Sequence, residues 1–185
     1  MTRTPADSPA SAYDMGHADE AEALATFAVL VDNEPGVLHR VVGLFAARGY
    51  NIESLTVAET DRGSGASRIT IVTRGTAQVL AQIEAQLQKM VSTRHVHNVT
   101  TDPNGAEREL ALVKVKGAGA DRAESLRLAE IFRTRVIDTT RTGFIFEITG
   151  APGKIDKFIG LMRPLGLVEV SRTGVLSIER GVEAS

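Results

Sequence analysis

The fold is decided by the stretch TFAVLVDNEPGVLHRVVGLFAARGYN, residues 26–51. Five of its first six residues are apolar, and this run predicts a short buried strand. Residues 32–36 are turn formers and interrupt that run. From Val37 the apolar residues recur at helical spacing, and Gly49 predicts the end of the helix. A strand, a tight bend and a helix therefore open the fold.

The residues after this helix predict two strands, a second helix and a third strand. The strands are expected at 51–60 and 67–73, joined by a hairpin turn, and at 91–100. Ile52 and Val57 are expected to alternate with polar neighbours on the first of them. The helix is expected at 76–90, where one stripe carries the apolar residues Val79, Leu80, Ile83, Leu87 and Met90. The order βαββαβ is typical of a split βαβ unit, with helices on one face of an antiparallel sheet.

The same order recurs after a turn at residues 103–105. The second set of elements is predicted at 109–116, 121–132 with Asp121 as N-cap, 136–140, 143–149, 153–162 and 167–179. We therefore predict an α+β fold of two ferredoxin-like βαββαβ units, residues 25–103 and 104–181. Such small units bury little surface, and one face of each sheet lacks helices, so we expect oligomerisation.

Composition excludes several classes of protein. The chain has 185 residues, no cysteine and a formal net charge of −2, so disulfide scaffolds, thiolate chemistry and cysteine metal sites are excluded. No apolar run approaches the roughly 20 residues of a membrane span. Residues 1–24 hold one arginine against five acidic residues and lack apolar periodicity. We interpret them as a disordered acidic tail, without signal-peptide features, of a cytoplasmic protein.

The bend between the first strand and the first helix is the strongest candidate site. Unpaired amides at a helix start attract anions, so the backbone near Gly36, Val37 and Leu38 could hold a carboxylate. The side-chain amide of Asn33 could orient the ligand or accept from an ammonium group. From spacing alone, a plain helix entry is an equally good interpretation. Asn51 is a second candidate, because asparagine is a poor strand former, although a simple turn role fits it better.

The sequence offers few other chemical groups. His95 and His97 share a strand face, but no third metal ligand is evident, so we predict neither a metal site nor a catalytic residue. Gly117-Ala118-Gly119 lacks the remaining features of a nucleotide loop and predicts a strand-to-helix turn. The βαββαβ order also occurs in RNA-binding modules, which need stacking aromatics on two central strands. Phe27 in the first unit and Phe144 and Phe146 in the second each lie on only one of the two strands, so we predict no nucleic-acid binding.

Several strings identify a family resemblance. NEPGVL at 33–38, RVVGLF at 40–45 and RGYNIESLTV at 48–57 resemble the regulatory (small) subunit of acetolactate synthase, also called acetohydroxyacid synthase. The likeness continues through QIEAQL at 82–87, REL at 108–110, EIFR at 130–133, ID at 137–138 and RTGV at 172–175. It covers residues 25–181, nearly everything outside the tail.

This resemblance implies a function. Residues 25–103 would form an ACT domain, a module that senses amino acids, and two copies would pair edge to edge as a homodimer. The effector, typically valine, would bind between them. Asn33, Gly36, Val37 and Leu38 of one chain would hold it, and the neighbour's Asn51 and Ile52 would complete the site.

The resemblance also implies a separate catalytic (large) subunit. That subunit would carry thiamine diphosphate, Mg²⁺ and FAD and would make 2-acetolactate from pyruvate. The present chain would bind no cofactor, would raise the activity of its partner and would confer feedback inhibition. Two rival hypotheses remain at this stage: an ACT-type sensor that controls another enzyme or a transcription factor, and a true enzyme.

Overall fold

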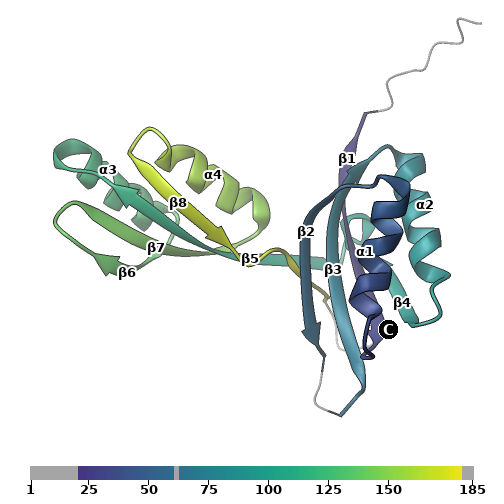
Figure 1. Ribbon diagram of the computed structural model, residues 1–185. Coiled ribbons are helices and arrows are strands. Elements are labelled where there is room, and N and C mark those ends of the chain that lie inside the picture. Colours follow the sequence, from purple (N-terminus) through teal and green to yellow (C-terminus); the bar gives the residue numbers. More distant parts are fainter. Residues whose placement is uncertain (1–20, 61–62, 181–185) are drawn as a thin grey trace, which may run out of the picture.

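A computed structural model describes residues 21–60 and 63–180. It contains two antiparallel sheets, each with two helices on one face (Figure 1). The first strand begins at Ala23, so it includes two residues that we assigned to the tail. The rest of the predicted tail, residues 1–20, lies outside the described residues. None of the described helices is long and apolar enough to cross a membrane.

The first unit has the predicted βαββαβ order. Its elements are β1 (Ala23–Asp32), α1 (Val37–Arg48), β2 (Ile52–Glu59), β3 (Ala66–Gly75), α2 (Ala77–Gln88) and β4 (Thr93–Asn98), followed by the 3₁₀ turn η1 (Val99–Thr101). The sheet order is β2-β3-β1-β4, which leaves β2 and β4 at the edges. The prediction of the fold is confirmed.

The core of this unit lies between the sheet and its two helices. Phe27, Val29 and Val31 of β1 are fully buried, together with Ile69 and Ile71 of β3. The predicted stripe of α2 packs against them. On β2 the core contacts come from Ile52 and Leu55. Val57 shares the face of Leu55, because both pair with buried isoleucines of β3, but it is 42% exposed on this edge strand. The pairing of β2 with β3 shifts between Ile52 and Ser54, and this bulge changes which residues face inward.

The second unit repeats this order. Its elements are β5 (Gly105–Lys116), α3 (Gly119–Ile131), β6 (Arg135–Thr139), β7 (Gly143–Gly150), α4 (Pro152–Met162), β8 (Leu167–Arg172) and β9 (Leu176–Glu179). The sheet order is β6-β7-β5-β8, and β9 pairs with the first residues of β5. Two details differ from the predictions. Ala118, rather than Asp121, is the N-cap of α3, and the strand expected at 167–179 is broken into β8 and β9.

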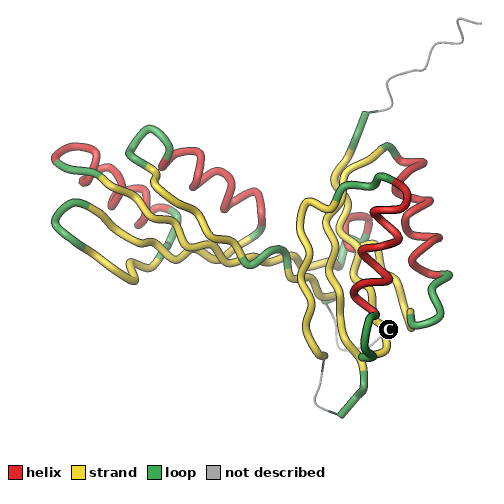
Figure 2. Tube along the Cα trace, in the orientation of Figure 1, coloured by secondary structure: helices red, strands yellow, loops and turns green. Residues whose placement is uncertain are grey.

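The break between β8 and β9 brings the two units into contact. Gly174, at the break, has φ 84°, and a Cβ there would lie 2.7 Å from the hydroxyls of Ser54 and Thr56. The Val175 N–H donates to Ser54 Oγ at 3.3 Å, and Arg68 Nη1 donates to the Ser177 carbonyl at 3.1 Å. Residues 173–177 therefore contact the helix-free face of the first sheet. Figure 2 shows strands running from one unit toward the other.

Candidate functional site

The bend between β1 and α1 depends on a left-handed glycine. Gly36 is the N-cap of α1 with φ 85°, and no side chain caps the helix. A Cβ placed on Gly36 would have no atom within 4 Å. The glycine is therefore required by its backbone conformation and not by crowding, and the space beside it is open.

The amides of this bend differ in their partners. The Val37 N–H donates to the Glu34 carbonyl at 3.2 Å, so it already has an acceptor. The N–H groups of Gly36 and Leu38 have no acceptor among the residues that the structure describes. The first turn of α1 contains no acidic residue. The bend thus keeps unpaired donors, among them the Gly36 and Leu38 amides, and the positive end of the helix dipole, which together favour an anion.

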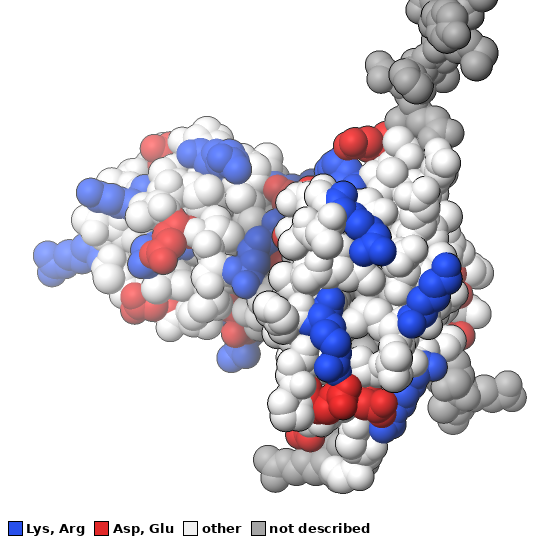
Figure 3. Space-filling model, turned by 45° about the vertical axis from the view of Figure 1, so that its right-hand side comes forward, with Lys and Arg blue, Asp and Glu red and all other residues white. Residues whose placement is uncertain are grey.

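Polar side chains tie the bend to the neighbouring hairpin. Asn33 Nδ2 donates to Glu59 Oε1 at 2.9 Å, which leaves the Asn33 carbonyl oxygen available as an acceptor. Arg94 pairs with Asp32 at 2.7 Å and also donates to the carbonyls of residues 64 and 65. Acidic and basic side chains accordingly lie side by side at the lower end of the first unit in Figure 3.

A shallow hollow adjoins the bend. It has a volume of about 420 Å³ and is lined by Glu34, Arg40, Leu44, Met90, Val91 and Ser92. Glu34 and Arg40 form an ion pair at its edge. Sequence reasoning missed both this pair and Glu59. The contact between Asn33 and Glu59 depends on strand register, for which the sequence carries no direct signal.

The remaining candidates lie at the opposite end of β2. Ile52 is the first residue of β2, whereas Glu59, the partner of Asn33, is the last. Asn51 is fixed there, because Thr73 Oγ1 donates to its carbonyl at 2.6 Å and its Nδ2 donates to Glu53 Oε1 at 3.1 Å. Eight residues at about 3.3 Å each separate these ends by roughly 25 Å. One chain therefore brings together Asn33, Gly36, Val37 and Leu38, but not Asn51 and Ile52.

The second unit contains a charge cluster of a different kind, built around one buried carboxylate. Arg172 donates from Nε and Nη2 to the Glu109 carboxylate at 2.8 and 2.5 Å, and from Nη1 to Asp156 at 2.7 Å. The Glu109 side chain is only 3% exposed. The hydrogen bond to Glu109 raises the pKa of Arg172 above its usual value. The cluster is fully paired, and we interpret it as structural.

Comparisons with known proteins cover both units. Residues 27–95 match the family described as "AHAS small subunit-like ACT domain", and residues 108–181 match "Small subunit of acetolactate synthase". The chain is 47% identical to a probable acetolactate synthase small subunit of Archaeoglobus fulgidus over 84% of this chain and 96% of that protein. It is 46% identical to the acetolactate synthase isozyme 3 small subunit of Escherichia coli, over 83% of this chain and 93% of that protein.

A solved structure is also similar. The crystal structure of the acetolactate synthase small subunit from Thermotoga maritima matches with a TM-score of 0.74 and 40% identity. The match covers 87% of this chain and 99% of that one. The likeness therefore extends over both sheets and not over the first unit alone.

Proposed function

Because the chain belongs to the acetolactate synthase small-subunit family, we propose that its β1–α1 bend binds valine or a related branched-chain amino acid for feedback inhibition. The chain is a regulatory, non-catalytic subunit that acts in branched-chain amino acid biosynthesis. The observation that carries the proposal is the open bend at Gly36, with two unpaired amides and no acidic residue in the following turn.

The sheet topology explains how a second copy could complete this site. β2 is an edge strand, and four of its eight residues are exposed. If β2 pairs antiparallel with β2 of a second copy, the Glu59 end of one strand meets the Ile52 end of the other. Asn33 and Gly36 of one chain would then lie near Asn51 and Ile52 of its partner. Residues that lie far apart in one chain would form one site in a homodimer.

Each end of a free amino acid has a matching group in this arrangement. The carboxylate would accept from the amides of Gly36 and Leu38 at the start of α1. The ammonium group would donate to the side-chain oxygen of Asn33. Because the ligand contacts both chains, it stabilises the paired arrangement that fits it. It does so only to the extent that it binds this arrangement more tightly than the alternative one. Coupling of this kind is typically about 1–3 kcal/mol.

The first test compares two matched glycines. Gly36→Asp places a like charge beside the ligand carboxylate, and aspartate tolerates the left-handed conformation. We expect valine inhibition of the reconstituted synthase to weaken at least tenfold, while activation of the catalytic subunit is retained. Asn33→Ala should act in the same direction. Gly119→Asp is the control, because Gly119 has φ 56° at the start of α3 in the second unit. Normal valine inhibition of both first-unit variants would refute the site.

A second test asks whether two chains share the site. Asn33→Ala and Asn51→Ala chains should each lose valine binding as homodimers. A mixed dimer would combine one intact site with one doubly altered site. Calorimetric titration of the mixture should therefore recover binding at up to half the normal stoichiometry. No recovery in verified mixed dimers would show that Asn33 and Asn51 do not contribute to one site from different chains.

The partner follows from the same family assignment. We propose that the chain binds and activates a separate catalytic subunit, which would carry thiamine diphosphate, Mg²⁺ and FAD, in the cytoplasm. Acetolactate production by the purified small subunit alone should be absent and should appear when the catalytic subunit is added. Co-purification of a different enzyme or of a transcription factor, without the synthase, would favour the rival sensor hypothesis.

A further inference from the structure

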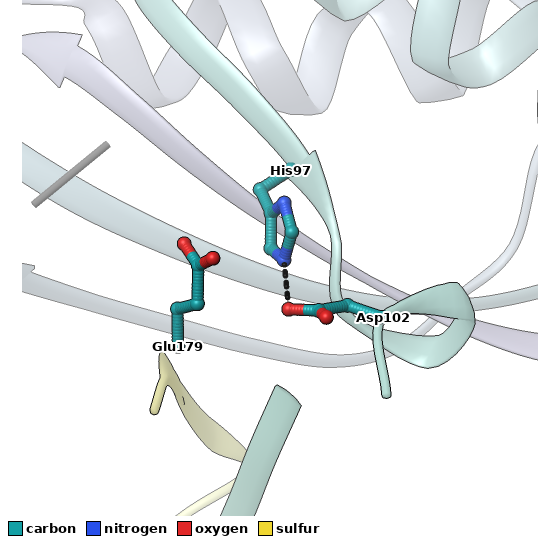
Figure 4. Close-up of side chains that lie close together, drawn as sticks. All are labelled: His97, Asp102 and Glu179. Atoms are coloured by element: carbon teal, nitrogen blue, oxygen red, sulfur yellow. Dashed lines mark hydrogen bonds and ion pairs between the residues drawn. The ribbon is translucent and has the colours of Figure 1, made fainter. Parts of the chain in front are cut away.

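Three side chains with metal-ligand atoms meet where the two units join. They are His97 of β4, Asp102 after η1 and Glu179 of β9 (Figure 4). One ligand atom from each lies within 4.8 Å of the other two. His97 Nε2 lies 3.0 Å from Asp102 Oδ2, and these two side chains are 30% and 13% exposed. The sequence showed only the two histidines, because the carboxylates come from segments that fold next to His97.

The backbone holds this group in place. Asp102 Oδ1 accepts from the Asn104 N–H at 2.8 Å, which leaves Oδ2 directed at His97. Gly105 pairs with Glu179 across the β5–β9 ladder and donates its N–H to the Asp102 carbonyl at 3.0 Å. A Cβ on Gly105 would lie 2.6 Å from the Val99 carbonyl oxygen, so this turn requires glycine. Outer contacts of this kind orient the ligands of metal sites.

We propose that His97, Asp102 and Glu179 bind a divalent first-row transition ion, with Zn²⁺ as the representative. Bonds of about 2.0–2.2 Å to nitrogen and oxygen put tetrahedral ligand atoms roughly 3.4 Å apart. His97 Nε2 and Asp102 Oδ2, 3.0 Å apart, are already near this separation. The Glu179 oxygen lies within 4.8 Å of both and needs to approach by at most about 1.4 Å, which rotation of this exposed side chain can supply. An imidazole ligand favours zinc, nickel or cobalt over Mg²⁺ and Ca²⁺. Three protein ligands leave a coordination position for water.

The ion would link the two units. His97 belongs to the first sheet, whereas Glu179 belongs to β9, which pairs with β5. A bound ion would therefore hold the C-terminal strand against the end of β4. It would stabilise the folded chain, because an ion that binds only the folded state raises the unfolding temperature.

The test is calorimetric titration of the full, untagged chain with ZnCl₂, alongside thermal unfolding with and without the ion. We expect one site per chain, a higher unfolding temperature with Zn²⁺ and no competition from excess Mg²⁺. Asp102→Asn retains the acceptor for Asn104, and Glu179→Gln retains the side-chain size. Each should weaken binding at least about tenfold, because loss of even an outer partner costs about 10–100-fold.

Two matched controls test which histidine is used. His95 stacks on His97, with ring centroids 6.4 Å apart, but it is absent from the ligand group. His95→Ala should retain most of the affinity for Zn²⁺, and so should His17→Ala in the N-terminal segment. His97→Ala should lose it. Absence of Zn²⁺ binding at 100 μM, or binding unaffected by Glu179→Gln and Asp102→Asn, would overturn the proposal.

Discussion

The two units share one order of elements but differ at the bend that follows their first strand. In the first unit, the bend holds Asn33, an open Gly36 and no acidic residue in the next helical turn. In the second unit, alanines flank Gly119, and Asp121 lies in the first turn of α3. An aspartate at that place already complements the helix dipole and repels a carboxylate. The proposed anion site therefore has its favourable charge environment in the first unit and not in the second.

The segment that leads into the second bend is in contact with its neighbours, although Gly119 itself is as open as Gly36. A Cβ on Gly117 would lie 3.4 Å from both the Arg122 amide nitrogen and the Leu165 carbonyl oxygen. The Gly117 N–H donates to the Thr142 carbonyl at 3.1 Å, so the segment is fixed by its neighbours. Arg122 lies over the Phe144 ring, with Cζ 3.9 Å from the centroid. Both helix-start glycines, Gly36 and Gly119, are open, so the two bends differ in the charge of the first helical turn and in the packing of the preceding segment, not in the space beside the glycine.

The largest expected loss of stability comes from replacing a glycine that is both left-handed and crowded, compared with one that is left-handed only. Gly166 has φ 92°, and a Cβ there would lie 2.0 Å from the Lys116 carbonyl oxygen. Gly166→Ala adds backbone strain to a steric clash and should lower the free energy of unfolding by about 3–5 kcal/mol. Gly36→Ala adds only the strain of the left-handed conformation and should lower the free energy of unfolding by about 1–2 kcal/mol. Urea titration of both variants measures the difference, and equal losses would contradict the contrast.

An intermediate effect is expected from the buried ion pair of the second unit. Glu109→Ala removes both acceptors of the Arg172 fork and leaves only Asp156. The loss should be about 2–4 kcal/mol, below the full cost of breaking a buried pair because the Arg172 side chain is 36% exposed. Valine affinity should be unchanged, since the cluster lies outside the proposed site.

A double variant provides the control for this prediction. Glu109→Ala with Arg172→Met removes the unpaired charge and should recover part of the lost stability. A fall in valine affinity without any loss of stability would show that the second unit contributes to effector binding after all.

Much of the fold could be predicted because local signals agreed with the global order. The bounds of α1 match the prediction at both ends, since Gly36 and Gly49 mark them. The errors arose where residues distant in the sequence decide which side chains are buried and where a strand ends. The core contact of Leu55 was missed, because it depends on a bulge in the pairing with β3 that is invisible in the sequence of β2 alone. The strand at 167–179 was continued through Gly174, whose left-handed turn becomes understandable only beside Ser54 and Thr56.

In the candidate site too, local features could be predicted from the sequence and long-range contacts could not. Asn33 and Gly36 were accessible to sequence reasoning because turn and helix-start chemistry is local. Glu59 was missed because strand register brings it to Asn33, and Asp102 and Glu179 were missed because folding of separate segments brings them to His97. The pairing of Asn33 with Asn51 of a second copy stays a prediction, because it depends on an interface between chains.

The smallest expected effect concerns the helix-free faces of the two sheets. The first face is contacted by residues 173–177, whereas the second exposes the cross-strand pair Lys114–Glu169, with N–O 2.6 Å. The hydrogen bond from Lys114 lowers the pKa of Glu169 below its usual 4.5. Any stability from this pair is therefore present above pH 4.5 and is lost as the pH falls through the lowered pKa. NMR titration of the Glu169 carboxylate should show a pKa that rises toward 4.5 in Lys114→Met and, through screening, in about 1 M salt. A pKa unchanged in Lys114→Met would show that this ion pair does not form on the second face in solution, and this part of the contrast between the two sheets would no longer hold.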